Sequence, residues 1–116
     1  IPHSSPVSRR IENRVPGADA NPYLAMAAGL ASGLYGIEHK VELPPSTSGN
    51  AYEDPNLQPL PPNLTAATRW LDQSEAAREY LGDTFVDHFV MTREYEVRRY
   101  EKAVTNWELH RYFEAI

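Results

Sequence analysis

Residues 21–37 form a run without a charged side chain, rich in alanine and glycine. Asn21 is a favourable N-cap, and Pro22 suits the first helical position, where its missing N–H is not needed. Gly36 is the residue expected to end this helix. A helix with no polar side is typical of burial on nearly all sides. The pattern therefore predicts a buried helix over residues 21–37.

Helix start and stop signals follow one another in the second half of the chain. Asn63 or Thr65 can start a helix that ends at about Asp72. Ser74 can then cap a short helix that ends at Gly82, because serine is a good N-cap and glycine a good C-cap. The spacing predicts two short helices in succession.

Charged and aromatic side chains are dense throughout residues 64–116, which we expect to be helical. Asp83 is predicted to cap a long helix over residues 84–104. Apolar residues recur on one side of this helix and predict a buried stripe: Phe85, Val86, Phe89, Val90, Val97, Tyr100 and Val104. Thr105 and Glu108 have the spacing of a capping box, which opens a last short helix.

Two stretches lack helical patterns. Residues 1–20 contain one candidate strand, from Arg9 to Val15, and only the short run Val41–Leu43 could pair with it. Residues 41–63 hold six of the ten prolines and are predicted to be a loop. An isolated strand is unstable, and so long a loop is uncommon inside a compact domain. Both features, with the absence of an initial methionine, predict that the chain is part of something larger.

Composition narrows the classes of function. The 116 residues carry 16 acidic and 11 basic side chains, a formal net charge of -5, and no cysteine. An acidic chain without a Lys/Arg block disfavours nucleic acid and anionic membranes as main partners, and a helix over residues 21–37 is too short to span a bilayer. The absence of cysteine excludes disulfides, thiolate zinc sites and a cysteine nucleophile. No hydrolase or nucleotide-loop motif is present, and the four histidines lack zinc-site spacing.

Charged residues in the candidate strand are of the types that bind anions and a divalent cation. Alternation along a strand places Arg10, Glu12 and Arg14 on one face. A guanidinium group can donate two parallel hydrogen bonds to one phosphate or carboxylate, and a carboxylate is a hard ligand for Mg²⁺ or Mn²⁺. The alternative is a solvated ladder in which the three side chains pair with one another, worth about 1 kcal/mol. The spacing alone leaves both interpretations open.

The run RRIENRVPGADANPYL, residues 9–24, closely resembles the C-terminal part of the glutamine synthetase catalytic domain. That family has the pattern R-x-E-x-R-x-P, then A-N-P-Y-L, an alanine-rich helix and a G-(I/L)-x-x-K segment, here Gly36 to Lys40. Later features match in the same order: Tyr52, Leu60-Pro61, Leu81-Gly82 and the run from Val104 to Glu108. The resemblance covers essentially the whole chain.

The resemblance implies an α+β fold with an antiparallel sheet, of which residues 1–116 form the C-terminal part. This piece is expected to be mostly α-helical with one or two short strands, and residues 1–20 to hold the strand and active-site segment. Relatives are cytoplasmic enzymes that assemble as ring-like homo-oligomers with active sites between subunits. They use ATP to phosphorylate the γ-carboxylate of glutamate, and ammonia or an amine then displaces the phosphate.

Residue roles also follow from the resemblance. Arg10 matches an arginine that contacts the ATP phosphates, and Glu12 matches a glutamate on the second divalent metal, Mg²⁺ or Mn²⁺. Arg14 matches the arginine that holds the carboxylate of the glutamate substrate. The family's other metal ligands and its amine pocket lie N-terminal to this chain, so residues 1–116 alone are expected to be inactive.

Three alternatives remain. The wording P-G-A-D-A-N-P-Y-L, with Asn13, is similar to the branch that includes γ-glutamylputrescine and polyamine synthetases. A non-catalytic helical interaction module would leave the Arg–Glu–Arg segment merely structural. A family member that has lost catalysis is the third. The regulatory adenylylation of one bacterial class does not carry over, because Tyr52 is followed by Glu53-Asp54-Pro55 rather than directly by Leu-Pro.

Overall fold

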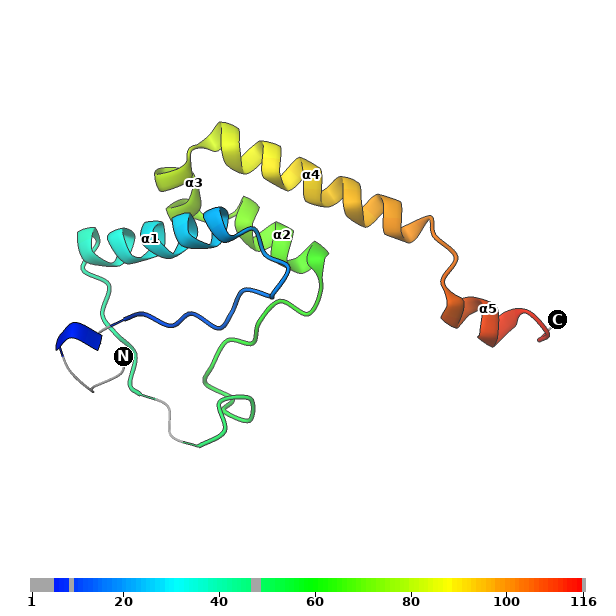
Figure 1. Cartoon of the computed structure of the whole chain (residues 1–116), viewed down its shortest axis with the longest axis horizontal. Coiled ribbons are helices and arrows are strands. Elements are labelled where there is room, and N and C mark those ends of the chain that lie inside the picture. Colours follow the sequence, from blue (N-terminus) through cyan, green and yellow to red (C-terminus); the bar gives the residue numbers. More distant parts are fainter. Residues whose placement is uncertain (1–5, 9, 47–48, 116) are drawn as a thin grey trace. The chain divides into compact units, whose positions relative to one another are not determined.

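The computed structural model describes residues 6–8, 10–46 and 49–115, and its regular structure is helical (Figure 1). The elements are the 3₁₀ helix η1 (Pro6–Ser8) and the α-helices α1 (Pro22–Glu38), α2 (Leu64–Asp72), α3 (Glu75–Leu81), α4 (Asp83–Glu101) and α5 (Asn106–Tyr112). Backbone contacts divide the chain into an N-terminal unit, Ile1–Glu42, and a C-terminal unit, Leu43–Ile116. The mostly helical character expected from the sequence is confirmed.

The predicted strand over residues 9–15 is wrong for the part that the structure describes. Residues 10–15 run without regular structure, the run Val41–Leu43 does not pair with them, and Arg9 lies outside the described residues (Figure 1). A strand is stable only in a ladder with several partners. The described chain supplies no such partner, so the one or two short strands expected from the sequence are not observed.

The start of α1 is as predicted. The side-chain oxygen of Asn21 accepts hydrogen bonds from the backbone N–H groups of Tyr23 (3.0 Å) and Leu24 (3.3 Å), and Pro22 is the first helical residue. Asn21 thereby satisfies two of the backbone donors that a helix leaves free at its first turn.

The end of α1 differs from the prediction. The helix passes through Gly36 and ends at Glu38, and Lys40 then adopts a left-handed conformation with φ 51°. The N–H of Val41 donates to the carbonyl of Gly36 (3.0 Å), and that of Lys40 to the carbonyl of Ile37 (3.3 Å). These bonds form a Schellman motif, so Lys40 takes the position that glycine usually fills.

The burial predicted for α1 is not seen in this chain. None of its residues is buried, and its large apolar side chains, such as Tyr23, Leu30 and Ile37, are mostly exposed. A helix that is apolar all round needs covering layers on several sides. The described residues do not provide these layers.

Two of the predicted caps in the C-terminal unit are confirmed. The side chain of Asn63 accepts from the N–H of Ala66 at 2.9 Å and starts α2, and Ser74 Oγ accepts from the N–H of Ala77 at 3.1 Å and starts α3. Gly82 ends α3 with φ 82°, a value that only glycine adopts readily. The turn between α3 and α4 therefore depends on this residue.

The long helix α4 departs from the prediction at both ends. Asp83 does not cap it, because the N-cap is Gly82 and the Asp83 carboxylate accepts a hydrogen bond from Arg78 instead. The helix ends at Glu101 rather than at residue 104. Backbone hydrogen bonding beyond Glu101 is replaced by a turn, in which Ala103 N–H donates to the carbonyl of Tyr100.

The buried stripe of α4 is confirmed only in its N-terminal part. Val86 is fully buried and Phe85, Phe89, Val90 and Val97 are half-buried, whereas Tyr100 and Val104 are exposed. The helix α2, which packs on α4, is roughly 13 Å long, while α4 is roughly 28 Å long. The shorter helix cannot cover the whole length of the longer one.

The predicted capping box opens α5. Glu108 N–H donates to Thr105 Oγ1 at 3.3 Å, and the Glu108 carboxylate accepts from the Thr105 N–H at 2.7 Å and the Thr105 hydroxyl at 2.9 Å. These two bonds to the carboxylate hold the pKa of Glu108 below its ordinary value, with the backbone bond as the larger cause. The start of α5 is therefore fixed by local bonds.

Candidate functional site

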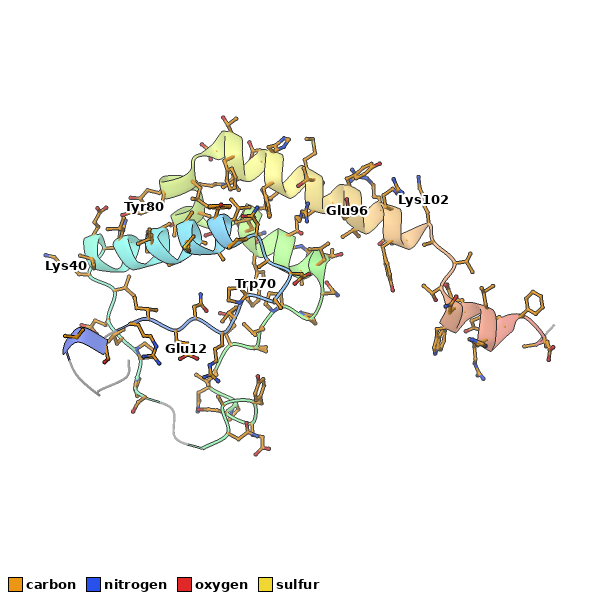
Figure 2. The ribbon with its side chains drawn as sticks, in the orientation of Figure 1. Glu12, Lys40, Trp70, Tyr80, Glu96 and Lys102 are labelled. Carbon is orange, nitrogen blue, oxygen red and sulfur yellow. The ribbon has the colours of Figure 1, made fainter. Side chains whose placement is uncertain are left out.

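The three candidate site residues lie on the extended segment that leads into α1. Arg10, Glu12 and Arg14 are all exposed, and Figure 2 labels Glu12 on this segment. No helix or strand fixes their backbone. Their positions depend instead on local bonds within residues 12–21.

Glu12 and Arg14 are brought together. The Nε and Nη2 atoms of Arg14 both lie 2.6 Å from Glu12 Oε1, and the two side chains are 85% and 47% exposed. Contact between residues two positions apart fits the predicted shared face of an extended segment. Among the described residues this ion pair does not include Arg10. An exposed pair contributes only about 0–1 kcal/mol, so either partner can exchange the other for a ligand at little cost.

A turn connects this pair to α1. The N–H of Ala20 donates to the carbonyl of Gly17 at 3.1 Å. A Cβ atom at position 17 would lie 2.6 Å from Asp19 Oδ1, so a larger residue would displace that side chain. Asn21 then caps the helix. The motif from Gly17 to Asn21 therefore places the Arg–Glu–Arg residues directly before the N-terminus of α1.

The chemistry of these side chains is that of anion binding and partial metal ligation. Arg10 and Arg14 offer planar, permanently charged donors for phosphate or carboxylate groups. Glu12 offers one oxygen ligand, whereas Mg²⁺ takes about six. Among the described residues no group of three His, Cys, Asp or Glu side chains could hold a metal ion. A complete metal site would need ligands from outside the described chain.

The histidines and Tyr52 lie in several different elements of the chain. His88 and His110 are exposed on α4 and α5, and His39 stacks on Tyr35 with ring centroids 4.1 Å apart. Tyr52 is almost fully exposed, in a turn where the Asn50 side chain accepts from its N–H at 3.1 Å. His3 lies outside the described residues.

A groove of about 400 Å³ lies between α2 and α4. Its lining is mixed in charge and polarity: Thr65, Thr68, Arg69, Asp72, Val90, Glu94, Val97 and Arg98. None of the three candidate site residues lines it.

The polar network around Arg78 was not predicted from the sequence. Its guanidinium donates to the carboxylates of Asp72 (2.7 Å), Asp83 (2.8 Å) and Asp87 (2.9 Å), and to the carbonyl of Asp72 (2.8 Å). The signal available in the sequence was one arginine with an aspartate at −6, +5 and +9. Those spacings cross two helix boundaries, so a helical repeat could not have identified them.

In the described residues, no helix is both long and apolar enough to cross a bilayer.

Comparison with known proteins gives consistent matches. The sequence model of the family described as "Glutamine synthetase, catalytic domain" matches residues 1–112. The chain is 45% identical over 111 residues to "Type-1 glutamine synthetase 2" of Dictyostelium discoideum, covering 92% of the chain and 21% of that protein.

Two further relatives have names that specify an amine. The chain is 45% identical over 109 residues to "Glutamate--isopropylamine ligase" of a Pseudomonas species, which covers 92% of the chain and 24% of the relative. It is 43% identical over 107 residues to "Gamma-glutamylethanolamide synthetase GlnA4" of Streptomyces coelicolor, covering 92% and 23%. The chain thus spans about a quarter of the length of these curated relatives.

Proposed function

The chain belongs to the glutamine synthetase family, and we propose that it is the C-terminal part of the catalytic domain of an ATP-dependent ligase that forms γ-glutamyl amides. In the proposed reaction a γ-carboxylate oxygen of glutamate attacks the terminal phosphorus of ATP, and ADP leaves. The nitrogen of ammonia or an amine then attacks the acyl phosphate, and inorganic phosphate leaves. The match over residues 1–112, which includes the whole Arg–Glu–Arg segment, is the observation that carries the proposal.

Each charged side chain of the segment has a proposed role. Arg10 binds the ATP phosphates, and Arg14 binds the carboxylate of the glutamate substrate. Glu12 is one oxygen ligand of a divalent cation, Mg²⁺ or Mn²⁺. The exposed Glu12–Arg14 ion pair supports this assignment, because it keeps both side chains on one side of the segment at a low cost of separation. Phosphoryl transfer depends mainly on such positioning and charge neutralisation.

The rest of the site is proposed to come from chain outside residues 1–116. Further metal ligands and the amine pocket would lie on that part of the protein. Ring-like homo-oligomers would place the site near a subunit interface. Residues 1–116 alone are therefore expected to show no ligase activity.

An amine acceptor other than ammonia is the second candidate. The names of the Pseudomonas and Streptomyces relatives, a glutamate–isopropylamine ligase and a γ-glutamylethanolamide synthetase, support it. Both are about as similar to this chain as the glutamine synthetase of Dictyostelium. Putrescine and longer polyamines belong to the same chemical class of primary amine. The residues that would select among them are not among Arg10, Glu12 and Arg14.

The test uses the natural full-length protein. Glutamate-dependent release of phosphate from ATP is measured with ammonia, ethanolamine, isopropylamine or putrescine as acceptor, and the γ-glutamyl product is identified by mass spectrometry. We expect an amide product with at least one acceptor, and the acceptor with the highest kcat/KM identifies the branch. Absence of product with every acceptor would favour the interaction module or a member that has lost catalysis. The 116-residue chain is the negative control.

A further inference from the structure

Arg78 lies in the middle of α3 and contacts both helices that flank α3 within the C-terminal unit. Its Nη2 and Nε atoms contact the carboxylate and the carbonyl of Asp72, the last residue of α2. Its Nη1 atom contacts Asp83 at 2.8 Å and Asp87 at 2.9 Å, in the first turns of α4. One side chain therefore joins the end of one helix to the start of another.

The contacts to Asp72 correct an unfavourable helix end. The last carbonyl groups of a helix lack intrahelical donors, and the negative end of the helix dipole repels a carboxylate. Asp72 presents both problems at the C-terminus of α2. The guanidinium of Arg78 supplies a donor to the carbonyl and a positive charge to the carboxylate, so it acts as a C-terminal cap from the next helix.

The contacts to α4 are made at a helix end where a carboxylate is already favourable. Asp83 and Asp87 lie near the N-terminus of α4, where the helix dipole favours negative charge. Between these ends, α3 has only seven residues, and a helix this short is not stable by itself. The hydrogen bonds of Arg78 thus give α3 its polar attachment to both neighbours.

The charge balance of the cluster makes it sensitive to the loss of Arg78. One guanidinium faces three carboxylates, and its side chain is 30% exposed. Hydrogen bonds to Asp83 and then Asp87 raise the pKa of Arg78 above its ordinary value, so the group stays charged. Without it, three negative charges from α2 and α4 would face one another with no cation between them.

We infer that Arg78 is a clamp that fixes the path from α2 through α3 into α4, a conformational device whose strength depends on charge. Arg78 is a positioning residue in this inference and takes no part in the proposed reaction. The clamp holds α4 against α2 at the end where Val86 is buried. Its removal exposes that end by charge repulsion, and the far end of α4 is unaffected.

The primary test is Arg78→Gln in the natural full-length protein, with hydrogen exchange followed by mass spectrometry on peptides that cover residues 72–87. We expect protection factors there to fall at least tenfold. Arg98→Gln is the matched control, because Arg98 makes one exposed pair with Glu94 on the same helix, at 3.7 Å. Protection over residues 72–87 is expected to stay within twofold of wild type in this control. Unchanged protection in Arg78→Gln would overturn the inference.

Salt separates a charge clamp from simple loss of packing. Added salt screens the repulsion that remains in Arg78→Gln. Protection over residues 72–87 should therefore rise roughly several-fold when the salt concentration is raised from about 0.05 to 0.5 M. Wild type should show no such rise, because salt screens attraction there. Adding Asp83→Asn and Asp87→Asn to the variant should restore at least half of the lost protection on a logarithmic scale. Absence of both the salt effect and the rescue would overturn the charge mechanism.

A conservative variant keeps the test decisive if Arg78→Gln does not fold. Arg78→Lys keeps the positive charge but cannot reproduce the fork of donors that reaches Asp72 and Asp83 together. We expect protection to fall to a level between wild type and Arg78→Gln, and not to rise when salt is added. Wild-type protection in Arg78→Lys would contradict the role of the fork.

Discussion

The Arg–Glu–Arg segment and the α2–α4 helices are held in place by different kinds of interaction. Among the described residues, residues 10–15 make an exposed ion pair and a bond from the Val15 N–H to the Asn13 side chain. The α2–α4 helices have caps, the fully buried Val86 and the four hydrogen bonds of Arg78. Among the described residues, the candidate site residues thus lie on a segment that is held by fewer interactions than the α2–α4 helices. The proposed phosphoryl transfer needs precise positioning, which we expect to come from partners outside the described residues.

The largest expected effect concerns the segment. Glu12→Gln in the full-length protein removes a negative charge but keeps the shape of the side chain, so we expect kcat/KM to fall about 10²–10³-fold. The melting temperature should change little, because the residue is exposed. Steady-state kinetics and calorimetry measure the two quantities.

The matched control for this prediction is Glu42→Gln, an exposed glutamate of the N-terminal unit. It should retain wild-type kinetics. Full activity in Glu12→Gln would contradict a role of the Arg–Glu–Arg segment in the proposed reaction.

The second effect concerns the packed helices. Val86 is 0% exposed, and Val86→Ala removes buried apolar volume, at a cost of about 2 kcal/mol in the free energy of unfolding. Val104→Ala removes the same atoms from a residue that is 70% exposed, and should change stability by less than about 0.5 kcal/mol. Denaturant unfolding measures both variants. Equal effects would mean that α2–α4 have no core of their own.

The smallest effect concerns α5 and its pH dependence. The bonds from Thr105 lower the pKa of Glu108, so the stabilisation by this carboxylate is complete above its unfolded pKa, about 4.3. It is lost as the pH falls through the lower folded value. We expect the helical Cα chemical shifts of residues 106–112 to decrease over that acid range.

Thr105→Ala provides the control for the acid transition of α5. It removes the hydroxyl that donates to Glu108 and accepts from its N–H, so the pH dependence should weaken and helicity at pH 7 should drop. A pH profile identical to wild type would show that the capping box does not set the stability of α5.

Local signals predicted the helices better than their ends or the strand. Asn21, Asn63, Ser74 and Thr105 were identified because a cap acts within three residues of itself. The predicted end of α1 at Gly36 is wrong because glycine is tolerated inside a helix. Lys40 instead adopts the left-handed conformation, which its residue type does not predict.

Features that depend on residues far apart along the chain could not be predicted from the sequence alone. A strand over residues 10–15 requires a partner, and alternation of side chains says nothing about whether one is present. Asp83 was taken for a cap because its competing partner, Arg78, lies on another helix. In the candidate site, alternation predicted a shared face for Glu12 and Arg14, whereas their roles came from family resemblance and stay predictions.

The proline-rich stretch that follows α1 has a consequence for the reach of the chain. Residues 43–63 contain no helix or strand among their described positions, and about twenty residues can reach across roughly 70 Å when extended. That reach is more than twice the length of α4.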